Sequence, residues 1–89
     1  MELNPRWDEN EGKLEATVTT SDFLAAVTLI SEVAAVAEEQ NHHPDIAIHD
    51  YSKVTISLIS HDAGEVTDKD YKLASAIDDL LENDEFGLL

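Results

Sequence analysis

The feature that most constrains the fold of this 89-residue chain is a change of hydrophobic period that occurs twice. In each half, short segments of alternating apolar and polar residues precede a longer segment in which apolar residues recur every three or four positions. Alternation is typical of strands with one buried face, and the longer spacing is typical of an amphipathic helix. The pattern therefore predicts two strands and a helix, followed by two more strands and a second helix.

The first half begins with a predicted β-hairpin. Its strands cover Trp7–Glu9 and Lys13–Thr19, and Leu14, Ala16 and Val18 alternate with polar residues in the second of them. Residues 10–12, Asn-Glu-Gly, have the composition of a turn.

A helix is predicted from Phe23 to about Gln40. Thr20, Ser21 and Asp22 provide a start signal of a hydroxyl cap followed by an acid. Asn41 is the expected terminator, since asparagine tolerates the left-handed conformation that ends many helices. The residues expected to face the core are Leu24, Val27, Ile30, Ala34 and Ala37.

The second half repeats this arrangement. Alternating residues predict strands around Ile46–Ile48 and Val54–Ile59, with a turn over Asp50–Lys53. Thr67 is the expected cap of the second helix, and Asp70, three residues later, completes a capping box with Asp in place of Glu. The buried stripe of this helix is expected to contain Leu73, Ala74, Ile77, Leu80 and Leu81.

Runs of strands without long crossovers predict an α+β fold of order ββαββα, a four-stranded antiparallel sheet with helices packed on one face. We expect a single domain over residues 1–89, in which residues 83–89 form a loose tail because they show no clear pattern. The open edge of so small a sheet favours pairing with a second copy.

Charge and cysteine content exclude several classes of function. Five basic residues against 20 acidic ones give a net charge of −15, which is opposite to what nucleic acids or anionic membranes attract. No apolar run approaches the roughly 18 residues of a membrane span, and the first residues lack a signal-peptide layout. Without cysteine the chain has no disulfide or thiolate nucleophile, and we expect a cytoplasmic location.

Three histidines stand out as candidates for chemistry. His42 and His43 lie where the first helix gives way to a strand, and His61 lies where a later strand ends. Chain ends of neighbouring elements converge at the rim of a sheet, so the three rings could line one cleft. Imidazole has an ordinary pKa near 6.5 and can therefore both give and take a proton near neutrality.

Three interpretations of the histidines are open. The ligands of a zinc site would come from His42, His43, His49 and His61, with Asp45 or Glu38. Against a metal, no His-x3-His spacing on a helix occurs, and neighbouring histidines rarely chelate one ion. Histidines are also commonly plain surface residues, as we assign His49. The third interpretation, which we favour, is general acid–base catalysis without a cofactor, since the chain has no thiol and no phosphate-cradling glycine loop.

The spacing of these residues resembles that of the pterin-4a-carbinolamine dehydratase family. The matching residues are Glu38-x3-His42-His43-Pro44, Tyr51, Lys53-Val54, Ser60-His61-Asp62-Ala63-Gly64 and Thr67-x2-Asp70-x2-Leu73-Ala74. The similarity extends from about Trp7 to Leu81. It implies a four-stranded sheet with helices on one face, and dehydration of 4a-hydroxytetrahydropterin to quinonoid dihydropterin, which recycles the cofactor of aromatic amino acid hydroxylases. It implies no metal and no organic cofactor.

The resemblance also implies the site residues. The catalytic positions are filled by His42, His43, His61, Asp70 and Glu38. The pterin would be bound by Asn41, His42, His43, Pro44, Ile59, Ser60, His61 and Asp62. One of His42 and His61 would act as the acid and the other as the base, while His43 holds the ring.

The resemblance is also compatible with a non-catalytic role. Relatives of this fold include non-catalytic binding proteins, namely a coactivator and an assembly factor, so the fold alone does not decide function. The family's members form dimers and tetramers, and we expect a homodimer or homotetramer here, with a pterin as the small-molecule ligand and a hydroxylase as a partner in the pathway.

Overall fold

The structure is a computed structural model that describes residues 3–82 and 86–88. Its elements follow the predicted order ββαββα. The strands are β1 (Asp8–Asn10), β2 (Lys13–Thr19), β3 (Asp45–His49) and β4 (Lys53–Leu58), and the helices are α1 (Phe23–Gln40) and α2 (Asp68–Leu81). None of the described helices is long and apolar enough to cross a membrane.

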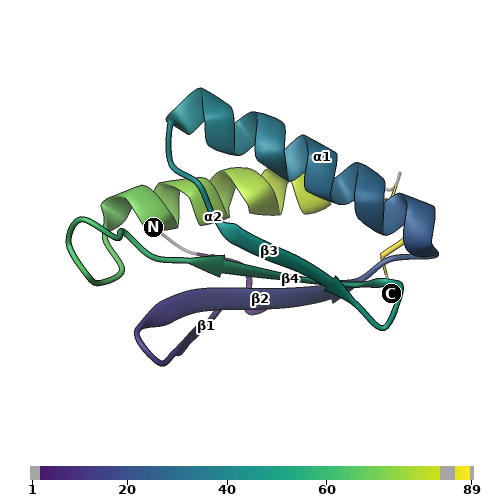
Figure 1. Ribbon diagram of the computed structural model, residues 1–89, viewed down its shortest axis with the longest axis horizontal. Coiled ribbons are helices and arrows are strands. Elements are labelled where there is room, and N and C mark those ends of the chain that lie inside the picture. Colours follow the sequence, from purple (N-terminus) through teal and green to yellow (C-terminus); the bar gives the residue numbers. More distant parts are fainter. Residues whose placement is uncertain (1–2, 83–85, 89) are drawn as a thin grey trace.

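The strands form one antiparallel sheet in the order β1-β2-β4-β3. Both helices lie on the same face of the sheet, and no described element covers its other face, called the uncovered face below (Figure 1). The predicted α+β fold, with its helices on one side of four strands, is therefore confirmed.

The register of the β3–β4 pair positions the candidate site. Asp45, the first residue of β3, pairs with Ser57 near the end of β4. The residues that precede β3 and those that follow β4 therefore come to the same end of the sheet. His42 and His43 belong to the first group and His61 to the second.

Two tight turns set the registers of the hairpins. Glu11 and Gly12 between β1 and β2 have φ angles of 53° and 78°, and Asp50 and Tyr51 between β3 and β4 have φ angles of 50° and 52°. Residues 11–12 form a two-residue connection, and two successive positive φ angles there are typical of the type I′ turn, whose twist matches that of antiparallel strands. The connection between β3 and β4 has three residues, 50–52. Tyr51 is consequently held at the opposite end of β4 from His61, with its side chain 70% exposed.

The ends of α1 are defined by local hydrogen bonds. Asp22 is the N-cap, and its carboxylate accepts a 2.7 Å hydrogen bond from the backbone N–H of Ala25. Asp22 therefore caps the helix itself, rather than following a hydroxyl cap. At the other end Asn41 adopts the left-handed conformation, with φ of 51° and ψ of 42°, as predicted for the terminator.

The predicted core face of α1 is wrong for three of its five residues. Ala26, Leu29, Val33 and Ala37 are the buried residues of this helix. Leu24 and Val27 are 71% and 41% exposed, and Ala34 is also exposed. The alanine-rich helix carries apolar residues around most of its circumference, so periodicity alone could not select the side that the sheet covers.

The core is completed by α2 and by residues near both ends of the chain. Leu73, Ala74, Ile77 and Leu81 of α2 are buried as predicted, and Leu80 packs against the core. Trp7 joins this cluster, and its Nε1 atom donates a 2.7 Å hydrogen bond to Asp78 on α2.

Part of the segment expected to be a loose tail is packed. Phe86 is fully buried in the core, and its carbonyl accepts a hydrogen bond from the backbone N–H of Ser21. Burying an aromatic side chain stabilises a small domain by about 1.5–3 kcal/mol, which explains why residues 86–88 are held against it. Residues 83–85 and 89, to which the same expectation applied, lie outside the described part of the chain.

Candidate active site

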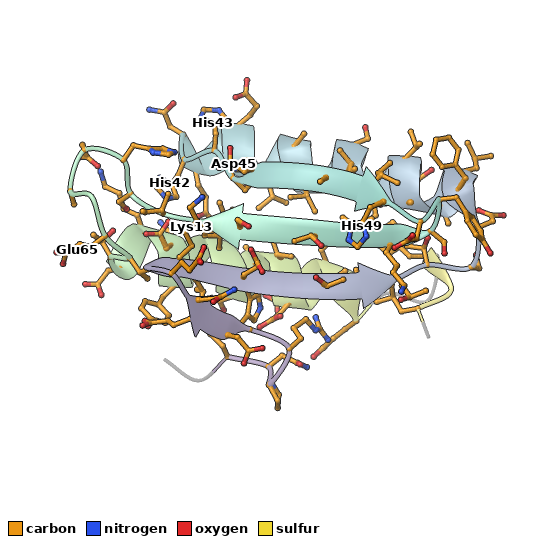
Figure 2. The ribbon with its side chains drawn as sticks, turned by 60° about the horizontal axis from the view of Figure 1, so that its bottom comes forward. Lys13, His42, His43, Asp45, His49 and Glu65 are labelled. Atoms are coloured by element: carbon orange, nitrogen blue, oxygen red, sulfur yellow. The ribbon has the colours of Figure 1, made fainter. Side chains whose placement is uncertain are left out.

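Three histidines line one hollow at the end of the sheet where β3 begins and β4 ends. The hollow has a volume of about 300 Å³. Figure 2 shows His42 and His43 together at this end of the sheet, and His49 at the opposite end. The residues that line the hollow are Asn41, His42, His43, Ile59, His61, Asp62 and Lys69. We call it the histidine hollow.

Local backbone structure brings each ring to this place. The left-handed Asn41 ends α1, and the backbone N–H of His42 still donates to the carbonyl of Ala37. After β4, the N–H groups of Ala63 and Gly64 both donate to the carbonyl of Ser60, which closes a turn around His61. Gly64 has φ of 69°, a conformation that favours glycine.

His42 is paired with a buried carboxylate. Its Nε2 atom lies 2.6 Å from Oδ1 of Asp70, a residue with no exposed surface. The other carboxylate oxygen of Asp70 accepts 2.9 Å hydrogen bonds from the hydroxyl of Ser60 and from the backbone N–H of Thr67. Thr67 is the N-cap of α2, so the predicted capping box is confirmed. Asp70 is therefore a buried acid whose oxygens are satisfied by three donors.

This arrangement determines which nitrogen of His42 is available for chemistry. A carboxylate only accepts hydrogen bonds, so Nε2 of His42 carries the proton of this contact. In the neutral ring, Nδ1 then carries a lone pair. A ring held in this tautomer can take a proton at Nδ1, and the carboxylate stabilises the imidazolium that results.

His43 has a partner of a different kind. Its Nε2 atom pairs with Oε2 of Glu38 on the last turn of α1. The side chains of His43 and Glu38 are 58% and 75% exposed, so water surrounds this contact. Glu38 can orient the ring of His43, but the pair has none of the enclosure of His42 and Asp70.

The structure brings most of the predicted site residues together. Asn41, His42, His43, Ile59, His61 and Asp62 line the histidine hollow. Asp70 contacts His42 and Glu38 contacts His43, so the two acids that the resemblance placed at the site do lie beside its histidines. Pro44 and Ser60 do not line this hollow; Ser60 is 1% exposed, and its hydroxyl donates a hydrogen bond to Asp70.

Sequence reasoning missed two residues of the site. Lys69, in the first turn of α2, lines the histidine hollow, and the hydroxyl of Thr67 lies 2.6 Å from that of Ser60. Lys69 had one usable signal, because it stands next to Asp70 and is a rare cation in an acidic chain. Thr67 was recognised only as a helix cap.

The other candidate ligands lie elsewhere. His49 is on the uncovered face of the sheet, where its ring contacts Asp50 and the hydroxyl of Thr55. No three histidine, aspartate or glutamate side chains gather in a metal-binding cluster within residues 3–82 and 86–88.

Next to Asp70 on α2, one tyrosine has a shifted pKa. The hydroxyl of Tyr71 donates a 3.0 Å hydrogen bond to Glu9 of β1. This hydrogen bond and the charge of Glu9 raise the pKa of Tyr71 above its ordinary value of 10.0, with smaller contributions from burial and from the charge of Asp70. The phenol therefore stays protonated, and a donor, over a wider pH range.

Comparisons of the sequence with known proteins give one consistent result. The profile of a family described as "Pterin 4 alpha carbinolamine dehydratase" matches residues 1–80. A protein of Chloroflexus aggregans named "Putative pterin-4-alpha-carbinolamine dehydratase" is 45% identical over 78 residues, which is 86% of this chain and 82% of the relative. A protein of Acidobacterium capsulatum with the same name is 43% identical over 77 residues, 86% of this chain and 83% of the relative.

Solved structures share the fold. One described as a "transcriptional coactivator/pterin dehydratase" from Brucella melitensis has a TM-score of 0.78 and 25% identity, covering 88% of this chain and 83% of that one. A pterin dehydratase-like protein described as a RuBisCO assembly factor in the α-carboxysome has a TM-score of 0.66, covering 90% and 89% of the two chains. At 17% identity, that likeness concerns the fold alone.

Proposed function

The chain belongs to the pterin 4α-carbinolamine dehydratase family, and on that premise we propose that it dehydrates 4a-hydroxytetrahydropterin to quinonoid dihydropterin. The single observation that carries this proposal is the histidine hollow, in which three imidazoles face one space and one of them is backed by a buried carboxylate. Proton transfer needs donors and acceptors placed around one ligand, and this hollow supplies them.

The reaction breaks the bond between C4a and its hydroxyl oxygen. A ring nitrogen gives up its proton to a base, its electron pair forms the new double bond, and the hydroxyl leaves as water after an acid protonates it. We propose that Nδ1 of His42 takes the nitrogen-bound proton, because Asp70 occupies Nε2 and stabilises the charged ring. His61 delivers the proton to the leaving hydroxyl, and His43 holds the pterin ring.

A turnover assay tests the proposal. Dehydration of 4a-hydroxytetrahydropterin is followed by absorbance in the purified protein and in the variants H42A, H61A and H49A. We expect H42A and H61A each to lower the rate by about 10²–10⁴-fold, the usual contribution of one proton-transfer group. H49A is the matched control, since His49 lies at the far end of the sheet. A wild-type rate no faster than the uncatalysed one, or unchanged rates in both H42A and H61A, contradicts the proposal.

The alternative function is a binding or assembly protein on the same scaffold. One observation favours it: Phe23, Leu24 and Val27 on α1 form an exposed apolar surface, and such surfaces commonly receive another protein chain. Capture of a partner by a chain without turnover would support this alternative. The histidine hollow favours the enzyme, because a scaffold has no need of three imidazoles around one ligand-sized space.

Three further predictions belong to the same proposal. They are a role in pterin cofactor recycling, a hydroxylase as partner in the pathway, and a cytoplasmic location.

Self-association to a homodimer or homotetramer is also a prediction. The exposed apolar residues of α1 and the open edge strand β3 are the surfaces that support it. Sedimentation equilibrium at micromolar concentration tests it, and a monomer under these conditions contradicts it.

A further inference from the structure

We propose that the pterin bound by this protein carries an anionic group, a phosphate or a carboxylate, on its side chain, and that Lys69 and Lys72 hold that group in a second hollow beside the histidine hollow. The inference rests on the proposed function for the bicyclic ring. It adds a substrate class, since it separates pterins with charged side chains from neutral ones.

The second hollow adjoins the first. It has a volume of about 310 Å³ and is lined by Gln40, Asn41, His42, Lys69 and Lys72. Asn41, His42 and Lys69 line both hollows, so His42 stands on their shared wall. A ligand whose ring contacts the three histidines can therefore extend a substituent past His42 and toward the two lysines. We call this second space the lysine hollow.

The charge of the lysine hollow is opposite to that of the chain. The protein has five basic residues against 20 acidic ones, yet among residues 3–82 and 86–88 two lysines and no carboxylate line this hollow. By contrast, the hollow beside β1 and β2 has Arg6 surrounded by Asp8, Glu9 and Glu15. A local reversal of sign in a strongly acidic protein marks a place where an anion is attracted and held.

Both ammonium groups are available to a ligand. Lys69 and Lys72 are exposed, and neither forms an ion pair with a carboxylate in residues 3–82 or 86–88. Their spacing of three residues in α2 places them on one face of the helix. Gln40 and Asn41 also line the hollow, and side-chain amides of this kind are able to donate N–H hydrogen bonds. Phosphate and carboxylate oxygens accept hydrogen bonds from both kinds of group.

A structural role for the lysines is the competing explanation. The last turn of α1 contains no basic residue, and Lys69 and Lys72 face its end, where the helix dipole is negative. In that case their removal would change the melting temperature and leave the selectivity among pterins unchanged. The experiment therefore measures both quantities.

The test compares three 4a-hydroxytetrahydropterins that differ only in the 6-substituent: a neutral hydroxyalkyl chain, its phosphate ester, and a chain ending in a carboxylate. We expect kcat/KM for at least one anionic substrate to exceed that of the neutral one by about tenfold. K72Q and K69Q should each lower this ratio by about three- to tenfold, as expected for a charge-assisted contact that is partly exposed to water. High salt should also lower the ratio of kcat/KM between the anionic and the neutral substrate.

K53Q is the matched control, because Lys53 is an exposed lysine at the other end of β4. We expect it to leave the ratio and the melting temperature unchanged. Preference for the phosphate ester over the carboxylate, or the reverse, identifies the anionic group. Equal kcat/KM for neutral and anionic substrates, or a ratio that K72Q and K69Q do not lower, overturns the inference while the dehydratase proposal stands.

A second measurement decides the case in which no pterin is turned over. Binding of oxidised, unreactive pterins with the same three substituents is then followed by intrinsic tryptophan fluorescence or calorimetry. Tighter binding of an anionic pterin that K72Q abolishes supports the lysine hollow, even though the dehydratase proposal has failed. Equal affinity for neutral and anionic pterins, or no binding of any of them, overturns it.

Discussion

Two neighbouring histidines in this protein each pair with a carboxylate, and the two pairs differ in almost every physical respect. His42 and Asp70 are 14% and 0% exposed, whereas His43 and Glu38 are 58% and 75% exposed. Asp70 also accepts hydrogen bonds from Ser60 and Thr67, while Glu38 stands on the open last turn of α1. Two consecutive histidines therefore form the same kind of contact with a carboxylate, one of them enclosed by protein and the other surrounded by water.

The difference shows that burial decides whether a carboxylate can fix the tautomer of a neighbouring histidine. Water and salt weaken an exposed pair, and such contacts contribute about 0–1 kcal/mol. An enclosed pair is screened far less, and removal of one partner leaves a buried polar group unsatisfied, which costs about 1–3 kcal/mol. Asp70 can therefore set the tautomer of His42, whereas Glu38 only biases the orientation of His43.

The largest effect is expected from D70N. Asparagine keeps one acceptor oxygen, but its amide nitrogen is a donor and would face either the ring N–H of His42 or the donors of Ser60 and Thr67. We expect turnover to fall by about 10²-fold or more and the free energy of unfolding to fall by about 1–3 kcal/mol. Steady-state kinetics and urea unfolding measure the two losses. Turnover within twofold of the wild type would show that Asp70 does not act on His42.

A smaller effect is expected from S60A, which removes one of the three hydrogen bonds to Asp70 without touching the histidine. The free energy of unfolding should fall by about 1 kcal/mol, the usual net value of one such bond. We expect kcat to fall more than KM changes, because Ser60 is a positioning residue. S57A is the control, since its hydroxyl bonds to Glu15 on the sheet. An equal effect of S57A and S60A on kcat would contradict the positioning role.

Added salt should weaken the coupling energy of the exposed pair more than that of the buried pair. Double-mutant cycles on His42–Asp70 and on His43–Glu38 measure each coupling energy at low and high ionic strength. We expect the coupling of the exposed pair to be under about 1 kcal/mol and to vanish near 1 M salt, where the screening length is about 3 Å. The coupling of the buried pair should persist. If both couplings fall equally with salt, burial does not distinguish the pairs.

E38Q should have a small effect. Glutamine keeps the length of the side chain and can still hydrogen-bond the ring of His43, and the site is solvated. We expect less than a threefold change in kcat/KM and less than about 0.5 kcal/mol in stability, as for most exposed substitutions. A loss of turnover comparable to that of D70N would mean that the exposed acid is as important as the buried one.

The smallest effect is expected from Y71F, which removes a neutral hydrogen-bond donor to the carboxylate of Glu9. The pKa of Tyr71 is raised in the folded protein, mainly by the hydrogen bond to Glu9. Folding therefore favours the protonated phenol, and this stabilisation is complete below the ordinary pKa of 10.0 and is lost as pH rises through the raised value. We expect the melting temperature of Y71F to decline less above pH 10 than that of the wild type. Parallel declines would contradict this assignment.

Much of the fold could be predicted from residues that are close in sequence. The turn at residues 10–12, the terminator Asn41 and the capping box of Thr67 with Asp70 all appear where the sequence places them. The bounds of the four strands and of α1 agree with the predicted ones to within one residue; β1, for example, begins and ends one residue later than predicted. These features depend on local backbone preferences, so a single sequence contains them.

Two predictions from the sequence were wrong: the buried face of α1 and the loose packing of the segment that contains Phe86. The choice between two apolar sides of α1 depends on which one the sheet meets, and Leu29 and Val33 meet it while Leu24 does not. Phe86 follows a segment without periodicity, yet it fills the core because the chain returns to the start of α1. Both outcomes depend on long-range packing.

For the candidate site, the sequence by itself determined the residues proposed for the chemistry: three histidines, two acids and the spacing that matches one family. Only the tertiary structure decided that Asp70 is enclosed and Glu38 is not, that Ser60 supports the acid instead of lining the hollow, and that two lysines stand beside His42. The physical reason is that residue type and spacing are local properties. Burial, hydrogen-bond partners and local charge arise only when α1, β4 and α2 pack together.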